Sequence, residues 1–156
     1  NRTGGAIMQK NLEILGDIQY TQDEIDFALD MQKANGKPLI GIDGKIRPLR
    51  ETLESPGGGS TDVGDVSYNV PVVSLAATTA PKGVPWHSWS VVASSGMSIG
   101  HKGMLHAAKA LGMSMIDIYK DKKLREEIKK EFDERIGDYN YDPYLNPGPP
   151  PIDYVD

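Results

Sequence analysis

Two short polar stretches flank an apolar segment, and together they hold the residue types best suited to chemistry. The first, residues 57–67, is glycine-rich and carries Asp62 and Asp65; the second, residues 84–89, places His87 between two tryptophans. The segment between them, Val70–Ala77, is almost continuously apolar and rich in β-branched residues, which predicts a strand buried on both faces. Ligands commonly bind where such strands end, so we expect a site here. A capped loop with a surface histidine fits the same residues about equally well.

His87 is the best single candidate for chemistry, because imidazole is a good ligand for zinc or manganese. A catalytic metal needs about three protein ligands, however, and here only Asp62 and Asp65 could support it. The other histidines, His101 and His106, are five residues apart, so on one helix they point about 140° apart and cannot bind one ion together. The sequence contains no Walker motif and no nucleophile elbow.

Composition limits the class of protein. The 156 residues suffice for one domain, and the net charge of −5 without a basic block makes nucleic acid an unsuitable partner. The apolar runs are too short to cross a membrane. There is no cysteine, which excludes disulfides and thiolate metal sites. The chain begins at Asn1 without a charged-then-apolar leader, as a segment of a longer protein would, and we expect a cytoplasmic location.

Helices dominate the predicted secondary structure. A capping box formed by Thr21 and Glu24 marks the start of one helix. Asp121 is a suitable N-cap for another helix, and Gly137 is a suitable C-cap for it. Apolar periodicity predicts helices over Ala6–Leu15, from Thr21 to about Gly36, over Ser98–Tyr119 and over Asp121–Ile136. The apolar residues within 37–56 follow no clear period. We expect a surface loop there, with a short strand near Leu39–Ile42. The body is therefore assigned to residues 1–137, and residues 138–156 to an extended tail rich in proline and tyrosine.

The order and spacing of these motifs resemble a known family. The stretches that carry the resemblance are residues 59–67, Val70-Pro71, His87-Ser88-Trp89 and residues 100–107. They resemble the carboxy-terminal part of the aminobenzoyl-glutamate hydrolase branch of the metal-dependent aminoacylase and carboxypeptidase superfamily, and the likeness extends from about Asn1 to the tail. Many relatives have proline after the His-Ser pair. Trp89 stands here instead, as in the aminobenzoyl-glutamate branch.

The resemblance implies a fold and a site. It implies an α/β class, with this chain as the carboxy-terminal portion of an α/β/α zinc-exopeptidase-like catalytic domain that contributes mostly helices and few strands. His87 matches the family's last metal ligand, and Ser60 and Asp62 match a motif beside the active site, where we expect them to position the substrate. His101 and His106 match the start of the final helix, and we expect them to be hydrogen-bonded structural residues. The general base and the other ligands would lie outside this chain.

The resemblance also implies an activity. The complete protein would be a metal-dependent amidohydrolase that cleaves an N-acyl or N-aroyl amino acid or a small dipeptide, using two zinc or manganese ions to polarise the carbonyl and activate water. The chain alone would be inactive and would not retain the ions. Its partners would be the rest of its own catalytic domain and lid, a small amide substrate, and a second copy in a homo-oligomer. The alternatives are a non-catalytic interaction module or an inactive relative.

Overall fold

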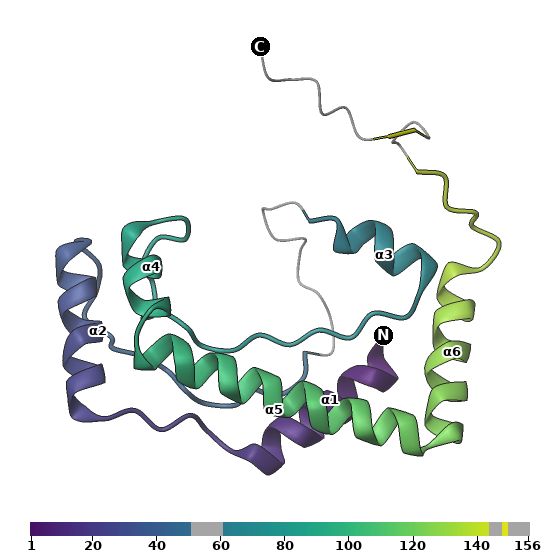
Figure 1. The fold of residues 1–156 in the computed structure, drawn as a ribbon, viewed down its shortest axis with the longest axis horizontal. Coiled ribbons are helices and arrows are strands. Elements are labelled where there is room, and N and C mark those ends of the chain that lie inside the picture. Colours follow the sequence, from purple (N-terminus) through teal and green to yellow (C-terminus); the bar gives the residue numbers. More distant parts are fainter. Residues whose placement is uncertain (51–60, 144–147, 150–156) are drawn as a thin grey trace.

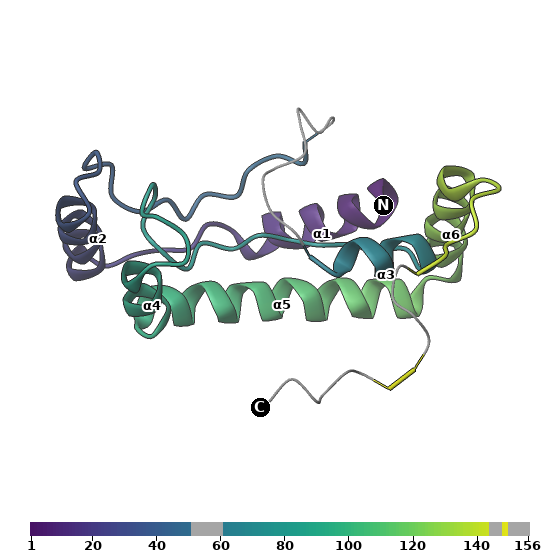
Figure 2. The ribbon, with the colours of Figure 1, turned by 90° about the horizontal axis from the view of Figure 1, so that it is seen from above.

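The protein forms an open, cradle-shaped layer of helices (Figure 1). A computed structural model describes residues 1–50, 61–143 and 148–149. The longest helix, α5 (Ser98–Lys120), runs along the base of the cradle, with α1 (Arg2–Leu15) beside it. The helices α2 (Gln22–Ala34) and α6 (Lys122–Ile136) rise at the two ends, and α3 (Val63–Asn69) and α4 (Trp89–Ser95) stand on either side of the space between them. Seen from above, α1 and α5 again lie side by side (Figure 2).

The closed part of the molecule lies where α1, α5 and α6 meet. Its apolar core is made by Met8, Ala110, Leu124 and Ile128, all of them buried. A polar contact ties α1 to α5, because the buried Asn11 donates from Nδ2 to the Ser114 hydroxyl at 3.0 Å. These helices therefore form a packed unit from the residues of this chain alone.

Glu131 on α6 stabilises the start of α1. Its two carboxylate oxygens accept hydrogen bonds from the backbone N–H groups of Arg2 at 2.6 Å and Thr3 at 2.7 Å. A helix leaves its first N–H groups without partners and has a positive N-terminal dipole, so a carboxylate is well suited to this position. Burial tends to raise the pKa of Glu131, but these hydrogen bonds bring it down to about 2.

A buried ion pair joins α2 to α5 at the other end of the cradle, next to the capping box of α2. The predicted capping box is present, with the Thr21 hydroxyl accepting from the Glu24 N–H and the Glu24 carboxylate accepting from the Thr21 N–H. The same carboxylate, which is only 4% exposed, pairs with Lys102 Nζ of α5 at 2.6 Å. Burial tends to raise the pKa of Glu24, yet the hydrogen bonds from Lys102 and Thr21 help lower it to about 2.

The predicted strand is not formed among the described residues. Residues 71–79 run as an extended segment along the base of the cradle, but no described residue is assigned to a β-strand, and the stretch near Leu39–Ile42 is a loop. The segment is also not buried: Val70 is exposed, and residues 71–80 are half-buried or exposed. A strand obtains its ladder of hydrogen bonds from a neighbouring strand, and the described residues supply none. The α/β fold class therefore stays a prediction.

Close packing positions the extended segment over the helices. A Cβ on Gly103 of α5 would lie 2.2 Å from the Thr78 carbonyl oxygen, and one on Gly4 of α1 would lie 2.3 Å from Val73 Cγ2. Only glycine permits so close an approach to a neighbouring backbone, as at Gly103, or to a β-branched side chain, as at Gly4. One face of the segment thus rests directly on α5 and α1.

The longest helix exposes a large apolar surface. Five of its large apolar side chains are each more than half exposed: Met104, Leu105, Met115, Ile116 and Tyr119. Such apolar surface commonly marks an interaction face.

Candidate active site

His87 lies in the loop that leads from the extended segment into α4. Its side chain is exposed, and its φ of 59° makes it the one non-glycine residue with positive φ among those the structure describes. This left-handed conformation is uncommon, although histidine adopts it more readily than most residues. The Ser88 hydroxyl stabilises the turn by donating to the Pro85 carbonyl at 2.6 Å. Strained residues of this kind cluster at functional sites.

Polar contacts from α2 fix the course of the chain before and after His87. Gln32, which is fully buried, donates from Nε2 to the carbonyls of Gly41 at 2.9 Å and Lys82 at 2.8 Å. Its Oε1 accepts from the N–H groups of Ile40 and Gly41. Asn35, just after α2, donates to the buried Ser90 hydroxyl of α4 at 2.7 Å. The loop that carries His87 is therefore held at both ends.

The glycine-rich stretch is only partly described. The predicted site residue Ser60 lies outside the described residues. Asp62 stands at the N-cap position of α3, where its side chain makes no capping hydrogen bond. Asp65, in the first turn of α3, accepts a hydrogen bond from the Tyr141 hydroxyl at 2.6 Å. The described part of this stretch therefore leads into a short helix, and every residue of that helix is exposed.

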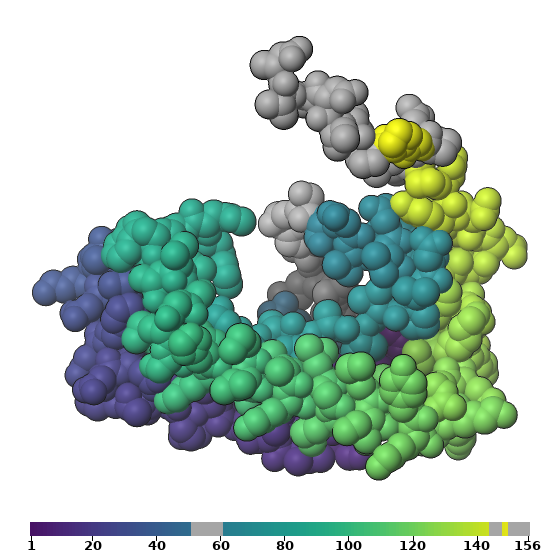
Figure 3. All heavy atoms as spheres, in the orientation of Figure 1, coloured from purple at the N-terminus to yellow at the C-terminus, as the bar shows by residue number. Residues whose placement is uncertain are grey.

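The structure does not bring the predicted residues together into a metal centre. The segment around His87 and the helix that Asp62 precedes stand on opposite rims of the hollow in Figure 3. Within residues 1–50 and 61–143, no group of three or more potential His, Asp or Glu ligands is close enough to hold an ion. One exposed histidine does not satisfy a catalytic metal, which takes three protein ligands or more. These residues therefore do not fit a complete metal site.

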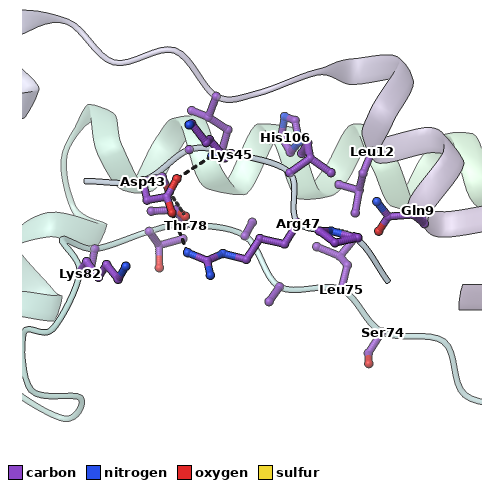
Figure 4. A pocket seen from close by; sticks show the side chains of 18 of the residues that line it. Gln9, Leu12, Asp43, Lys45, Arg47, Ser74, Leu75, Thr78, Lys82 and His106 are labelled. Atoms are coloured by element: carbon purple, nitrogen blue, oxygen red, sulfur yellow. Dashed lines mark hydrogen bonds and ion pairs between the residues drawn. The ribbon is translucent and has the colours of Figure 1, made fainter. Parts of the chain in front are cut away.

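A cavity of about 770 Å³ lies between the extended segment, α1 and the loop 43–50. Figure 4 shows Arg47 reaching across it toward Asp43 and Thr78, with Leu75 and Ser74 on the extended segment and His106 on α5 behind. Arg47 pairs with Asp43 at 2.7 Å. The N–H of Lys45 and the Arg47 guanidinium together hold the pKa of the Asp43 carboxyl below its usual range. The sequence pattern did not indicate this cavity.

The two remaining histidines differ from each other. His101 is exposed on α5, whereas His106 is half-buried and lines the cavity. The Nε2 atom of His106 is buried and has no hydrogen-bond partner among the described residues. The expectation that His106 is a hydrogen-bonded structural residue is therefore wrong for this nitrogen. A buried polar atom without a partner costs free energy, because it has lost its water and gained nothing in exchange.

Two short helices were absent from the sequence prediction. They are α3, which follows Asp62, and α4, which follows Ser88; both residues are common N-caps, and Asp65 adds an acid in the first turn of α3. Helices of seven residues give fewer than two full periods of apolar spacing, so capping residues are the only clear sequence signal for them.

Comparison with known proteins identifies a relative in the hydrolase class. The chain is 30% identical over 155 residues to the B subunit of p-aminobenzoyl-glutamate hydrolase from Escherichia coli (strain K12). The similarity covers 84% of this chain and 32% of the relative, so the chain spans about a third of the relative's length. No family model matches the chain. No solved structure matches it. Among the described residues, no helix is long and apolar enough to cross a membrane.

Proposed function

We propose that this chain is part of an amidohydrolase that cleaves the amide bond of an N-aroyl or N-acyl amino acid, with p-aminobenzoyl-glutamate as the model substrate. The observation that carries the proposal is the 30% identity to the B subunit of p-aminobenzoyl-glutamate hydrolase across 84% of this chain. Because the match includes most of the chain, the likeness is not confined to one short motif. The proposed α/β/α catalytic domain would be completed by polypeptide beyond these residues.

Within this enzyme we assign His87 as one ligand of a divalent-metal centre of two zinc or manganese ions. Three features support the assignment: the side chain is exposed, its backbone is in the left-handed region, and the loop is anchored through Gln32 and Ser90. An anchored loop with an accessible imidazole is suited to a ligand that must keep its place. The described residues do not complete a centre, so the proposal takes the remaining ligands and the general base from outside them.

Ser60 and Asp62 are proposed to position the substrate rather than to bind metal. Asp62 is exposed and makes no capping bond, so its carboxylate is available to a ligand that enters from the hollow. The relative is named as a subunit, which supports an assembly for this protein too. The large exposed apolar surface of α5 is consistent with such an assembly.

The experiment is to incubate the longer polypeptide that carries this chain with p-aminobenzoyl-glutamate and to measure release of p-aminobenzoate. We expect release that stops when a chelator removes divalent ions and resumes when zinc or manganese is restored. If the folded, metal-loaded polypeptide releases no p-aminobenzoate and hydrolyses no other N-acyl amino acid, the proposed function is wrong. Release that is indifferent to chelation would contradict the metal assignment alone.

A further inference from the structure

The loop with His87 exposes two large aromatic side chains. Trp86 is 73% exposed and Trp89 is 57% exposed, and they are the two tryptophans of the whole chain. Tryptophan is on average a deeply buried residue in folded proteins, so two exposed indoles within four positions need an explanation. The loop and α4 stand at one rim of the hollow in Figure 3. The indoles therefore lie at the candidate site.

The short helix α4 has a polar inner face and an apolar outer face. Ser90 and Ser94 are fully buried, whereas Trp89 and Val92 are exposed. The serines find their hydrogen bonds inside the molecule, since Ser90 accepts from Asn35 and Ser94 donates to the Ser90 carbonyl at 2.7 Å. A surface helix normally has the opposite orientation. The outer face of α4 is thus suited to an apolar partner, which the described residues do not supply.

The backbone that carries the indoles is held in place. Hydrogen bonds from Gln32 and Asn35 fix the chain before and after the loop. The buried Val84 adds an apolar anchor, and the Ser88 hydroxyl closes the turn on the Pro85 carbonyl. An aromatic side chain on a fixed backbone loses little freedom when a ligand packs against it. These rings can therefore serve as a preorganised binding surface.

Both indoles belong to residues next to His87. Consecutive Cα atoms are about 3.8 Å apart, so the Cα of Trp86 lies about that far from the Cα of His87, and the Cα of Trp89 lies within about 7 Å of it. In an N-aroyl amino acid the ring is bonded directly to the carbonyl carbon of the scissile amide. A substrate whose carbonyl lies beside His87 therefore brings its ring close to the indoles.

We propose that Trp86 and Trp89 bind the acyl group of the substrate and select an aromatic ring over an aliphatic one. An aromatic ring can stack on an indole or meet it edge to face, and these arrangements contribute more than the burial of apolar area alone. A saturated ring of similar size has only the area term. The proposal rests on the proposed function for the reaction, and it adds the residues that make an aroyl group the preferred acyl group.

A segment of polypeptide is a poorer occupant of this surface. To cover both indoles it would have to pass over His87, which lies between them in the sequence and is exposed. A covered imidazole would not be accessible to a substrate. Such a segment would also make stability depend on the indoles, which gives a measurable difference between the two occupants.

The first test is a binding measurement that does not depend on catalysis. Calorimetry on the longer polypeptide, freed of divalent ions, compares benzoate with cyclohexanecarboxylate, which has the same charge and similar size but no π-face. We expect benzoate to bind about three- to tenfold more tightly, and the double variant Trp86→Leu with Trp89→Leu to lose this preference. Wild-type protein without a preference for benzoate overturns the proposal. A preference that survives in the double variant also overturns it.

The second test measures turnover of p-aminobenzoyl-glutamate and cyclohexanecarbonyl-glutamate by the metal-loaded longer polypeptide. The two amides differ in intrinsic reactivity, so the informative quantity is the change in the ratio of their kcat/KM values between wild type and variant. The double leucine variant should lower this ratio about three- to tenfold, and Trp86→Phe with Trp89→Phe should keep most of it. As the control, Tyr119→Leu removes an exposed ring at the far end of α5 and should leave the ratio unchanged.

The outcomes separate the two proposals. Hydrolysis with an unchanged ratio in the double leucine variant contradicts the role of the indoles alone. If that variant also melts several degrees lower, the indoles support polypeptide instead of substrate. Hydrolysis of neither substrate by the folded, metal-loaded wild type contradicts the proposed function, and the benzoate titration then tests the indoles separately.

Discussion

The two sides of the cradle differ in whether their own residues supply a packed core and hydrogen-bond partners. Where α1, α5 and α6 meet, buried Met8, Ala110 and Leu124 make a core, and Glu131 satisfies the free amides at the start of α1. On the opposite side, the extended segment has no strand partner among the described residues, and the loop with His87 is exposed. Stability and the candidate chemistry therefore lie in different layers. Among the described residues, the helices supply a packed core of their own, whereas the segment next to the site has no strand partner.

The largest effect is expected from His87, on the open side. In the longer polypeptide, His87→Ala should lower turnover by more than the roughly 10- to 100-fold loss that follows removal of a residue supporting a metal ligand. Stability should stay within about 1 kcal/mol, because the side chain is exposed. Turnover, metal content and melting temperature are measured together.

Alanine variants of the two histidines of α5, His101 and His106, serve as controls for His87→Ala. His106→Ala removes a half-buried ring and should lower the melting temperature while turnover stays near wild type. The exposed His101→Ala should change neither quantity. Full activity in His87→Ala would contradict the site assignment, and a stable but inactive His106→Ala would move the catalytic role to α5.

The contact between the two layers is tested by a pair of glycines on the same helix. Gly103→Ala would bring a methyl group to 2.2 Å from the Thr78 carbonyl, so the extended segment must shift. We expect a loss of about 1–3 kcal/mol in the free energy of unfolding, as for other overpacked sites. Gly112→Ala meets nothing within 4 Å and should gain about 0.5–1 kcal/mol. Urea unfolding measures both; a neutral Gly103→Ala would show that the segment does not rest on α5.

The contacts between helices at both ends of the cradle should show a specific sensitivity to acid. The pKa values of Glu24 and Glu131 are about 2 in the folded protein, against an ordinary value of 4.5. A carboxylate whose pKa is lowered by folding stabilises the protein fully above its unfolded value, and that contribution is lost as the pH falls toward the folded value. Stability should therefore decrease between about pH 5 and pH 2.

Glutamine variants isolate these two carboxylates. The double variant Glu24→Gln with Glu131→Gln should be less stable near neutral pH but should lose less stability on acidification, measured by thermal melting from about pH 7 to pH 3. Glu13→Gln, at an exposed position of α1, should keep the wild-type pH dependence. An unchanged acid response in the double variant would show that other groups control it.

The smallest effect is expected at α3, on the rim of the open side. The Tyr68 ring packs against Tyr139 at 5.1 Å and stacks on Tyr141 at 5.8 Å between ring centroids, and the Tyr141 hydroxyl donates to Asp65. Tyr141→Phe keeps the stacking but removes that hydrogen bond, which contributes about 1 kcal/mol or less at an exposed position. Faster amide exchange confined to α3, with unchanged exchange in α6, is the expected result. Loss of exchange protection across α5 would mean that the tail supports the whole layer.

Local sequence signals predicted the longer helices well. The capping box at Thr21, the N-cap at Asp121 and the apolar stripes of α5 and α6 act within a few residues, so the helices form where the pattern places them. A strand at Val70–Ala77 needs a neighbouring strand, which the described residues do not supply, and among them the segment is extended without strand pairing. Likewise, the sequence indicated His87 but could not place it against other ligands, because a metal site is a property of distant segments.

The role of His87 in a metal site that the isolated chain does not complete is tested most directly by a zinc and manganese titration. Calorimetry is performed on the isolated chain, on the longer polypeptide and on its His87→Ala variant. We predict weak binding by the isolated chain, tight binding of two ions by the longer polypeptide, and loss of tight binding at one or both positions in His87→Ala. Tight stoichiometric binding by the isolated chain would contradict the claim that its site layer is incomplete, and an unchanged titration in the His87→Ala variant would contradict the role of His87.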